Sequence, residues 1–378
     1  MIAQLFKKIK HELSYDFGAS YAPYPTGITI ELNYNCMFRC KICQIWKDDF
    51  KNTRLVGNKI LGKDELLRII DELSGLKVNY IYFCGGEPFL RNDFFDIVDY
   101  CKSKKIYCST ISNGYLIDEG LSEKIVASKL DLLGISIDSA SGSLHDEIRG
   151  AKNAFYRATE GIRLIKKRQM ELNTEIPEVF INCTVSSKNF MVLHEIVDLA
   201  KSLNVRRINF NYLSVLDSKT VELTNRVMGE KVVGYHTFSN IDSEYLLQKE
   251  QVDQLDFVIE NIKNKCGSEI KCDLDPALAN KNKELLLEGK FAVSRCNIPW
   301  KSAMITPLGD VVPCAMFTDY KMGNIREETF SEIWNNERAR HIRSLLSKNL
   351  PPICQKCCMV HKDTLPLWKR FYHRFLKQ

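Results

Sequence analysis

Three cysteines lie within eight positions of the segment NYNCMFRCKICQIW, residues 33–46. Cys36, Cys40 and Cys43 follow the spacing C-x3-C-x2-C, and the next cysteine is Cys84. Thiolates bind zinc ions and iron-sulfur clusters. Structural zinc takes four ligands, whereas a cubane cluster can be held by three cysteines while its fourth iron stays open. The spacing therefore favours a cluster with one open iron, and a zinc site completed by a distant residue is the alternative.

A second group of cysteines lies near the C-terminus. The residues before the second of them read as two short strands joined at Leu308-Gly309-Asp310, and residues 323–346 have helical spacing. A hairpin, a helix and a final C-x2-C pair would bring four thiolates together, as in a zinc ribbon or an iron-sulfur site. The members of this group are Cys296, Cys314, Cys354, Cys357 and Cys358. The other cysteines stand singly or in apolar runs, where a buried inert thiol is the common outcome: Cys84, Cys101, Cys108, Cys183, Cys266 and Cys272.

Short β-rich runs alternate with amphipathic stretches over the first 213 residues. Strands are expected at 27–32, 80–84, 106–112, 132–138, 179–185 and 207–213, and helices at 63–76, 92–103, 118–128, 155–169 and 189–203. This alternation predicts an α/β fold with a parallel sheet wrapped by helices, as an open barrel or a flat doubly wound sheet. In either case the functional residues should lie at the carboxyl ends of the strands.

Glycine and polar residues follow the expected strands at that edge. The second strand leads into Gly-Gly-Glu-Pro, the third into Ser-Asn-Gly and the fourth into Ser-Ile-Asp-Ser. Each has an ordinary structural explanation, because Gly, Pro and Asn-Gly form turns and Asp caps helices. Together they also suit a ligand site, because glycines admit close backbone approach and polar side chains contact the ligand. The candidates are Gly85, Gly86, Glu87, Asn113, Ser136, Asp138 and Arg149.

The composition is that of an ordinary globular protein of 378 residues, 45% hydrophobic and 26% charged. A formal net charge of +6 is small for this length and does not support a nucleic-acid partner. We find neither an export signal nor an apolar stretch near the roughly 20 residues of a membrane-spanning helix, so we expect a cytoplasmic protein. In that compartment, clustered cysteines indicate metal or redox chemistry more than disulfides.

The chain resembles the radical S-adenosylmethionine (SAM) enzymes. The resemblance rests on the cysteine triplet after the first strand, on Gly-Gly-Glu-Pro after the second, and on SIDSASGSLHDEIRG at residues 136–150. It implies a partial (βα)6 TIM-type barrel over residues 27–213, with a [4Fe-4S] cluster on Cys36, Cys40 and Cys43 whose open iron binds SAM. In this family the reduced cluster cleaves SAM to methionine and a 5'-deoxyadenosyl radical, which abstracts hydrogen from the substrate.

The resemblance also suggests SAM contacts position by position. The Gly85-Gly86-Glu87 segment matches the one that contacts the methionyl amino group, Ser136 matches a ribose contact, and Arg149 would face the methionyl carboxylate. Asn113, Asp138 and Asn182 are further candidates. The residue before the third cysteine is often aromatic in this family and packs near the adenine, but here it is Ile42.

The C-terminal cysteine group resembles the auxiliary-cluster module called Twitch, a shortened SPASM domain, through PW, GDVVPC and GNI...EIWN. The resemblance implies one auxiliary [4Fe-4S] cluster on Cys296, Cys314, Cys354 and Cys357, because no cysteine follows Cys358. A fully ligated cluster would transfer electrons, for example from a substrate radical during an oxidation. Cys358 could replace Cys357 as a ligand, act as a catalytic hydrogen donor in an epimerase, or be idle.

We expect five regions along the chain. They are an amphipathic basic segment at 1–26, the barrel at 27–213, a linking helical region at 214–290, a Twitch/SPASM-like hairpin and helix at 291–360, and a basic aromatic tail at 361–378. Apolar and basic residues alternate at helical spacing in both terminal segments. They are expected to pack on the protein or to contact a membrane surface peripherally, at its inner face.

The expected reaction is oxidation, crosslinking or epimerisation of a peptide or small molecule, with flavodoxin or ferredoxin as electron donor. The 26 residues before the first strand are too few for the peptide-recognition domain of related enzymes, which weakens the peptide alternative without excluding it. A lipid or membrane-associated substrate is one alternative. A non-catalytic iron-sulfur or zinc redox protein is another, although such a protein has no need of the SAM-site residues.

Overall fold

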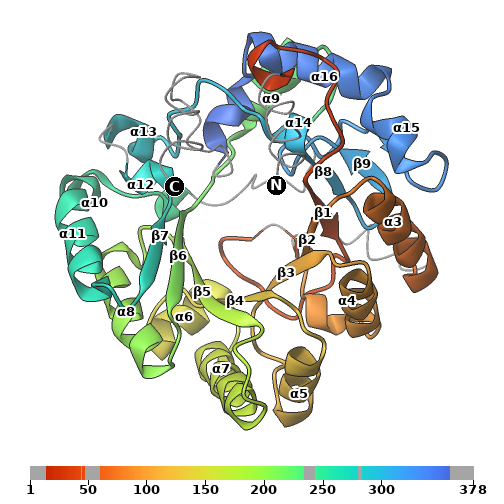
Figure 1. Cartoon of the computed structure of the whole chain (residues 1–378). Helices are drawn as coiled ribbons and strands as arrows, with labels where there is room; N and C mark the ends of the chain where they lie inside the picture. The colour runs from red at the N-terminus through yellow and green to blue at the C-terminus, as the bar shows by residue number, and fades with distance from the viewer. Residues whose placement is uncertain (1–13, 44, 47–59, 234–242, 280–282, 358–378) are drawn as a thin grey trace.

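The computed structural model describes residues 14–43, 45–46, 60–233, 243–279 and 283–357. Its strands form a single sheet in the order β10-β9-β8-β1-β2-β3-β4-β5-β6-β7, curved into an open barrel with helices outside it (Figure 1). The strands are β1 (Gly27–Glu31), β2 (Tyr80–Cys84), β3 (Tyr107–Ser112), β4 (Leu132–Ser136), β5 (Glu178–Val185), β6 (Arg207–Tyr212), β7 (Lys271–Leu274), β8 (Ser302–Ile305), β9 (Asp310–Val312) and β10 (Gly323–Asn324). The expected α/β barrel is therefore confirmed, and the flat sheet is not what forms.

The helices on the outside of the barrel follow the predicted pattern. They are α3 (Lys63–Gly75), α4 (Phe94–Ser103), α5 (Glu119–Ala127), α7 (Ala154–Glu171) and α8 (Leu193–Ser202), with α6 (Gly142–Arg149) inserted after β4. The remaining helices are α9 (Ser218–Met228), α10 (Lys249–Asp253), α11 (Leu255–Cys266), α12 (Pro276–Ala279), α13 (Lys283–Leu287), α14 (Ile298–Lys301), α15 (Phe330–Trp334) and α16 (Glu337–Lys348), followed by the 3-10 turn η6 (Pro352–Lys356).

Alternation along each strand separates the core from the barrel interior. On β1 and β2, Ile28, Ile30, Ile81 and Phe83 are completely or almost completely buried among the apolar side chains of the surrounding helices. Each such side chain contributes about 1.5–3 kcal/mol when buried. Because side chains alternate in a strand, the intervening residues face the barrel interior, where the site is built.

The sheet continues beyond residue 213 at both edges. Strand β7 pairs in parallel with β6, and β8 pairs in parallel with β1 in the register Gly27↔Ser302. Strand β9 returns antiparallel to β8, which confirms the predicted hairpin, with its turn at Gly309 (φ +88°). Figure 1 accordingly shows the blue C-terminal strands beside β1, so the C-terminal module extends the barrel sheet.

The prediction of one helical stretch over residues 323–346 is wrong in part. Residues 323–324 form β10, and two helices follow instead of one. Side chains cap each helix separately: the Thr329 hydroxyl accepts from the Glu332 backbone N–H, and Asn336 accepts from that of Ala339. Such caps begin new helices, so periodicity alone concealed the break between α15 and α16.

A disulfide joins Cys266 and Cys272, with 6.6 Å between their Cα atoms. The expectation of inert thiols is therefore wrong for these two cysteines. Helix α11 ends at Cys266, Gly267 reverses the chain with φ +54°, and β7 begins at Lys271. This turn brings together two residues that are six positions apart.

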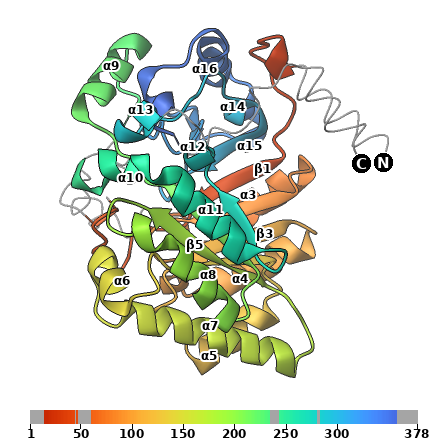
Figure 2. The same cartoon turned by 90° about the vertical axis from the view of Figure 1, so that its left-hand side faces the viewer.

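The residues before β1 pack against the C-terminal module. The indole N–H of Trp300 donates to the Ala19 carbonyl (2.7 Å), and that of Trp334 donates to the Pro23 carbonyl (2.8 Å). The buried Arg343 side chain donates to the carbonyls of Pro299 and Trp334 at 2.7 and 2.8 Å. Figure 2 shows α14 and α16 at the same end of the molecule, where these contacts gather.

We expect Arg343→Met to destabilise this module. The guanidinium is fully buried, and each carbonyl left without its donor costs about 1–3 kcal/mol. The free energy of unfolding should fall by several kcal/mol, measured as a lower thermal midpoint under argon. Arg340→Met, on the exposed face of the same helix, is the matched control and should change the midpoint little. Equal midpoints for the two variants would contradict this account of Arg343.

Within the described ranges, none of the helices combines the length and apolar character required to span a bilayer. The first half of the N-terminal basic segment and the whole C-terminal tail lie outside the described residues, as does Cys358. The predicted peripheral membrane contact of these segments therefore stays a prediction.

Candidate active site

One cavity of about 220 Å³ opens at the carboxyl ends of the first barrel strands. It brings together residues that are more than 100 positions apart in the sequence. Among the candidates, those that line it are Cys36, Cys40, Cys43, Gly85, Gly86, Glu87, Asn113, Ser136 and Arg149. The candidates Asp138 and Asn182 are not among the described residues that line this cavity.

The three cysteines lie on a loop that is fixed by its own apolar side chains. Phe38 and Ile42 of this loop are buried against Ile148 of α6 and Leu213 after β6. Burial raises the pKa of Cys36 to about 11 and that of Cys43 to about 12. Three thiols that line one cavity are a donor set for a soft, thiolate-binding metal centre such as an iron-sulfur cluster.

The two glycines after β2 hold the cysteine loop. The Gly86 N–H donates to the Asn33 carbonyl (2.8 Å), and the Glu87 N–H donates to the Asn35 carbonyl (2.7 Å). A Cβ atom on Gly86 would lie 1.9 Å from the Asn35 carbonyl oxygen, and Gly85 has φ +128°. These positions therefore require glycine so that two loops can lie against each other, whatever contact they also make with a ligand.

Glu87 connects the loops that follow β2 and β3. Its buried carboxylate accepts from the Ser112 hydroxyl (2.7 Å), the Asn113 N–H (2.9 Å) and the Phe89 N–H (3.3 Å). Burial nevertheless raises the pKa of Glu87 to about 7. The carboxylate thus orients the Asn113 backbone at the cavity wall.

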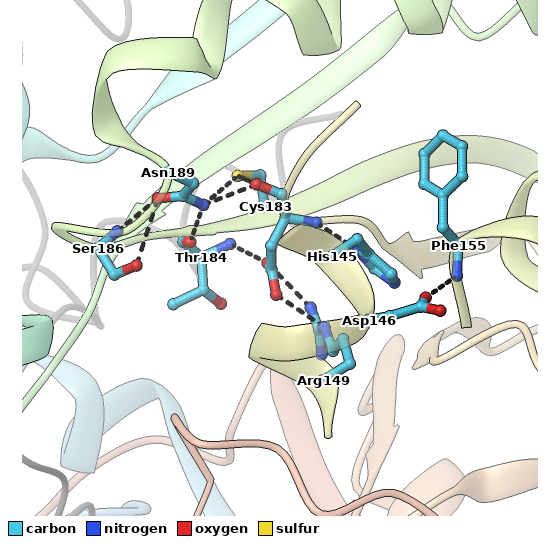
Figure 3. Close-up of polar contacts among 9 residues, drawn as sticks. His145, Asp146, Arg149, Phe155, Cys183, Thr184, Ser186 and Asn189 are labelled. Carbon is cyan, nitrogen blue, oxygen red and sulfur yellow. Dashed lines mark hydrogen bonds and ion pairs between the residues drawn. The ribbon is translucent and has the colours of Figure 1, made fainter. Parts of the chain in front are cut away.

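Arg149 and Asp138 form a buried ion pair beside the cavity. The Arg149 Nε lies 2.7 Å from Asp138 Oδ2, and Asp138 Oδ1 also accepts from the Thr184 N–H (2.9 Å; Figure 3). Asp138 therefore acts on the cavity through Arg149. Asn182, on β5, accepts from the Asn211 side chain through its Oδ1 at 2.8 Å.

Sequence reasoning missed several lining residues. They are Tyr82, Cys84, Thr184, Ile111, Ile45 and Trp46. The Trp46 indole N–H donates to the Cys40 carbonyl at 2.8 Å. Trp46 could have been identified as an aromatic residue three positions after the last cysteine. Tyr82 and Cys84 could have been identified because they alternate along the strand with the buried Ile81 and Phe83.

Glu31 is a further buried acid that the sequence analysis did not identify. It pairs in register with Cys84, so both side chains face the barrel interior, and the Glu31 carboxylate raises the pKa of the buried Cys84 thiol further. Its Oε2 has no hydrogen-bond partner among the described residues. Burial raises the pKa of Glu31 to about 8, so the carboxyl is favoured in its neutral form.

This shift predicts a pH-dependent stability. The folded state holds the Glu31 proton up to about pH 8, whereas an unperturbed Glu loses it near 4.5. The stabilisation is complete below pH 4.5 and is lost as pH rises toward 8, by at most about 1.4 kcal/mol per pH unit. Glu31→Gln should flatten this slope in anaerobic thermal unfolding, whereas the exposed Glu222→Gln should keep it. A wild-type slope in Glu31→Gln would show that other groups cause the dependence.

The C-terminal cysteines also converge. Cys296 precedes α14, Cys314 follows β9, and Cys354 and Cys357 lie in and directly after η6. Burial raises the pKa of Cys296 to about 12, and the neighbouring Cys314 raises it further. Burial likewise raises the pKa of Cys354, and the neighbouring Cys296 and Cys314 raise it further. The mutual influence of these three thiols indicates that they lie near one another.

The family models match both cysteine sites. The radical SAM superfamily matches residues 30–177, and the iron-sulfur cluster-binding domain SPASM matches residues 296–358. This chain is a radical SAM enzyme with a SPASM domain. SAM, a [4Fe-4S] cluster and auxiliary iron-sulfur binding are accordingly its cofactor chemistry.

Known relatives of this radical SAM chain cover most of its length. An AdoMet-dependent heme synthase of Methanosarcina barkeri is 26% identical over 82% of this chain and 82% of that protein. A PqqA peptide cyclase of Granulibacter bethesdensis is 22% identical over 83% of this chain and 75% of that protein. The crystal structure of Streptococcus suis SuiB bound to the precursor peptide SuiA has the same fold, with a TM-score of 0.63, 16% identity and coverage of 89% and 70%.

Proposed function

We propose that this radical SAM enzyme modifies a peptide by hydrogen abstraction, in an oxidation, crosslinking or epimerisation. The observation that carries the proposal is the cavity in which the cysteine triplet, the Gly-Gly-Glu segment and Arg149 meet. The proposal is supported by the similarity of this chain to a PqqA peptide cyclase.

Cys36, Cys40 and Cys43 would hold the N-terminal cluster, which when bound supplies the electron for reductive cleavage of the SAM sulfonium. Around it, Glu87, Asn113, Ser136 and Arg149 would bind and orient SAM. The proposed roles of Gly85 and Gly86 are to present the backbone of their loop, while Asp138 acts through Arg149. Asn182, on β5, is a further proposed contact. Apolar walls such as Ile42 and Ile111 would exclude water from the reacting groups.

The proposed auxiliary ligands are Cys296, Cys314, Cys354 and Cys357, holding one [4Fe-4S] cluster. Four protein ligands leave no open iron, so this centre would serve electron transfer. The alternatives for Cys358, as a substitute ligand or as a hydrogen donor, stay proposals. Flavodoxin or ferredoxin is the proposed electron donor for the N-terminal cluster.

A small molecule is the second candidate substrate, and a specific observation favours it. The relative with 26% identity is named as a heme synthase, and it is matched over a similar share of the chain. The two candidates differ in the mass of the product and in the size of the substrate that the barrel must admit.

The test begins with anaerobic reconstitution of the full chain with iron and sulfide. We expect about eight irons and, after reduction with dithionite, formation of 5'-deoxyadenosine from SAM. Precursor peptides encoded beside the gene should then be incubated with the enzyme and examined by mass spectrometry for loss of hydrogen or for incorporation of solvent deuterium. Cleavage of SAM with no peptide change, but with a changed small molecule, would favour the second candidate. Bound zinc without cleavage would overturn both.

A further inference from the structure

The end of helix α6 lies directly against the cysteine loop. The Lys41 N–H donates to the Ile148 carbonyl at 2.9 Å. Gly150 has φ +58°, and a Cβ atom there would lie 2.3 Å from the Arg39 carbonyl oxygen. The backbone on both sides of Cys40 is therefore in contact with the residues on both sides of Arg149.

The Arg149 side chain is fixed by a carboxylate that is itself fixed. Its Nη2 donates to Asp138 Oδ1 (3.0 Å), in addition to the contact of Nε with Oδ2 at 2.7 Å. The Asp138 carboxylate is completely buried and also accepts from Thr184 of β5. The orientation of the guanidinium thus depends on the loop after β4 and on β5.

The Asp138 backbone is held as firmly as its side chain. Its N–H donates to His145 Nδ1 (3.1 Å), and its carbonyl accepts from Asn189 Nδ2 (2.7 Å). Asn189 Oδ1 in turn accepts from the Ser186 N–H at 2.8 Å. Figure 3 shows Arg149, His145, Thr184 and Asn189 gathered in one polar network. These contacts hold Asp138 in place, and Asp138 in turn holds the Arg149 guanidinium.

The Arg149 guanidinium brings a positive charge near Cys40. The residues on either side of Cys40, Arg39 and Lys41, contact those on either side of Arg149, which places the two side chains close together. Both side chains line the same cavity. At a partly buried site a cation beside a thiolate interacts more strongly than in bulk water, because less solvent screens the charges.

We propose that Arg149, held by Asp138, is a positioning residue for Cys40 that sets the charge around the N-terminal cluster. This inference rests on the proposed function, since it takes Cys40 as a cluster ligand. Reduction adds a negative charge to the cluster, so a nearby cation favours the reduced form and a nearby carboxylate disfavours it. The pair therefore has two members whose removal should shift the cluster potential in opposite directions.

The test is an anaerobic redox titration of the reconstituted full chain without SAM, followed by electron paramagnetic resonance. Arg149→Gln should lower the midpoint potential of the N-terminal cluster, and Asp138→Asn should raise it. Each shift should be at least tenfold in the equilibrium constant for reduction, about 59 mV for one electron. The auxiliary cluster serves as an internal reference and should not shift. The matched control is the Arg207–Asp273 pair (3.0 Å) at the other end of the barrel, where Arg207→Gln and Asp273→Asn should leave both potentials unchanged.

Opposite signs separate an electrostatic role from a structural one, because loosening of the loop would move both variants in the same direction. Shifts of one sign, or no shift, overturn the inference. If Arg149→Gln loses the cluster, Arg149→Lys decides: recovery of cluster and potential supports the inference, and continued loss overturns it. Failure of the proposed function is distinguishable, since the wild-type chain would then lack the N-terminal signal or the cleavage of SAM.

Discussion

Replacement of Cys36, Cys40 and Cys43 by alanine together should abolish reductive cleavage of SAM and leave about four irons per chain. The iron that stays would belong to the proposed C-terminal site, where Cys296, Cys314 and Cys354 lie near one another. Because cleavage needs the electron supplied at the triplet, the loss should reach the detection limit. The measurements are iron content and 5'-deoxyadenosine formation under dithionite.

The matched control is Cys101→Ala, in the buried core of α4. This variant removes a thiol without touching either site, so it should keep about eight irons and the wild-type rate of cleavage. Cleavage that survives in the triple variant would contradict the assignment of the triplet. Loss of all iron in that variant would instead show that the two sites depend on each other for folding.

The second large effect is expected for Gly86→Ala. Its new methyl group would lie 1.9 Å from the Asn35 carbonyl oxygen, far closer than a non-bonded contact allows, so the cysteine loop would have to move. The loop can yield only by breaking the hydrogen bonds of Gly86 and Glu87 to Asn33 and Asn35. We therefore expect loss of most of the N-terminal cluster and at least tenfold slower SAM cleavage, measured on reconstituted protein.

A methyl group added elsewhere tests whether this effect is local. Gly75 ends helix α3, and a Cβ atom there meets nothing within 4 Å. Gly75→Ala should retain both clusters and the rate of cleavage, and it should not destabilise the fold, because Ala is the better helix former. Equal behaviour of the two variants would show that the contact with Asn35 does not constrain the loop.

Much of the barrel could be predicted because its signals are local. Strands β1 to β6 were each located within a few residues, since β-branched and aromatic residues alternate with amphipathic helices. Helix α6 was not predicted as an element, because its eight residues contain few apolar positions and its amphipathic pattern is too short to recognise. The hairpin β8–β9 was found from its turn, but not its place in the sheet.

The candidate site divides in a similar way. The cysteine triplet and the Gly-Gly-Glu segment follow from residue type and spacing, which are properties of a short stretch of chain. The different roles of Asp138 and Arg149 do not follow from spacing. Asp138 is completely buried and influences the cavity only through its ion pair with Arg149. The carboxyl of Glu31 went unnoticed because a single acid in a strand carries no spacing signal.

The sequence by itself determined the metal-binding chemistry and the repeated β-α units, because both depend on residues a few positions apart. Only the tertiary structure decided that β8 pairs with β1, that Ala19 and Pro23 pack on the C-terminal module, and that Arg149 and Cys40 line one cavity. These contacts join residues far apart in the chain. Their partners are selected by burial and hydrogen bonding across the whole fold, and no local pattern encodes that selection.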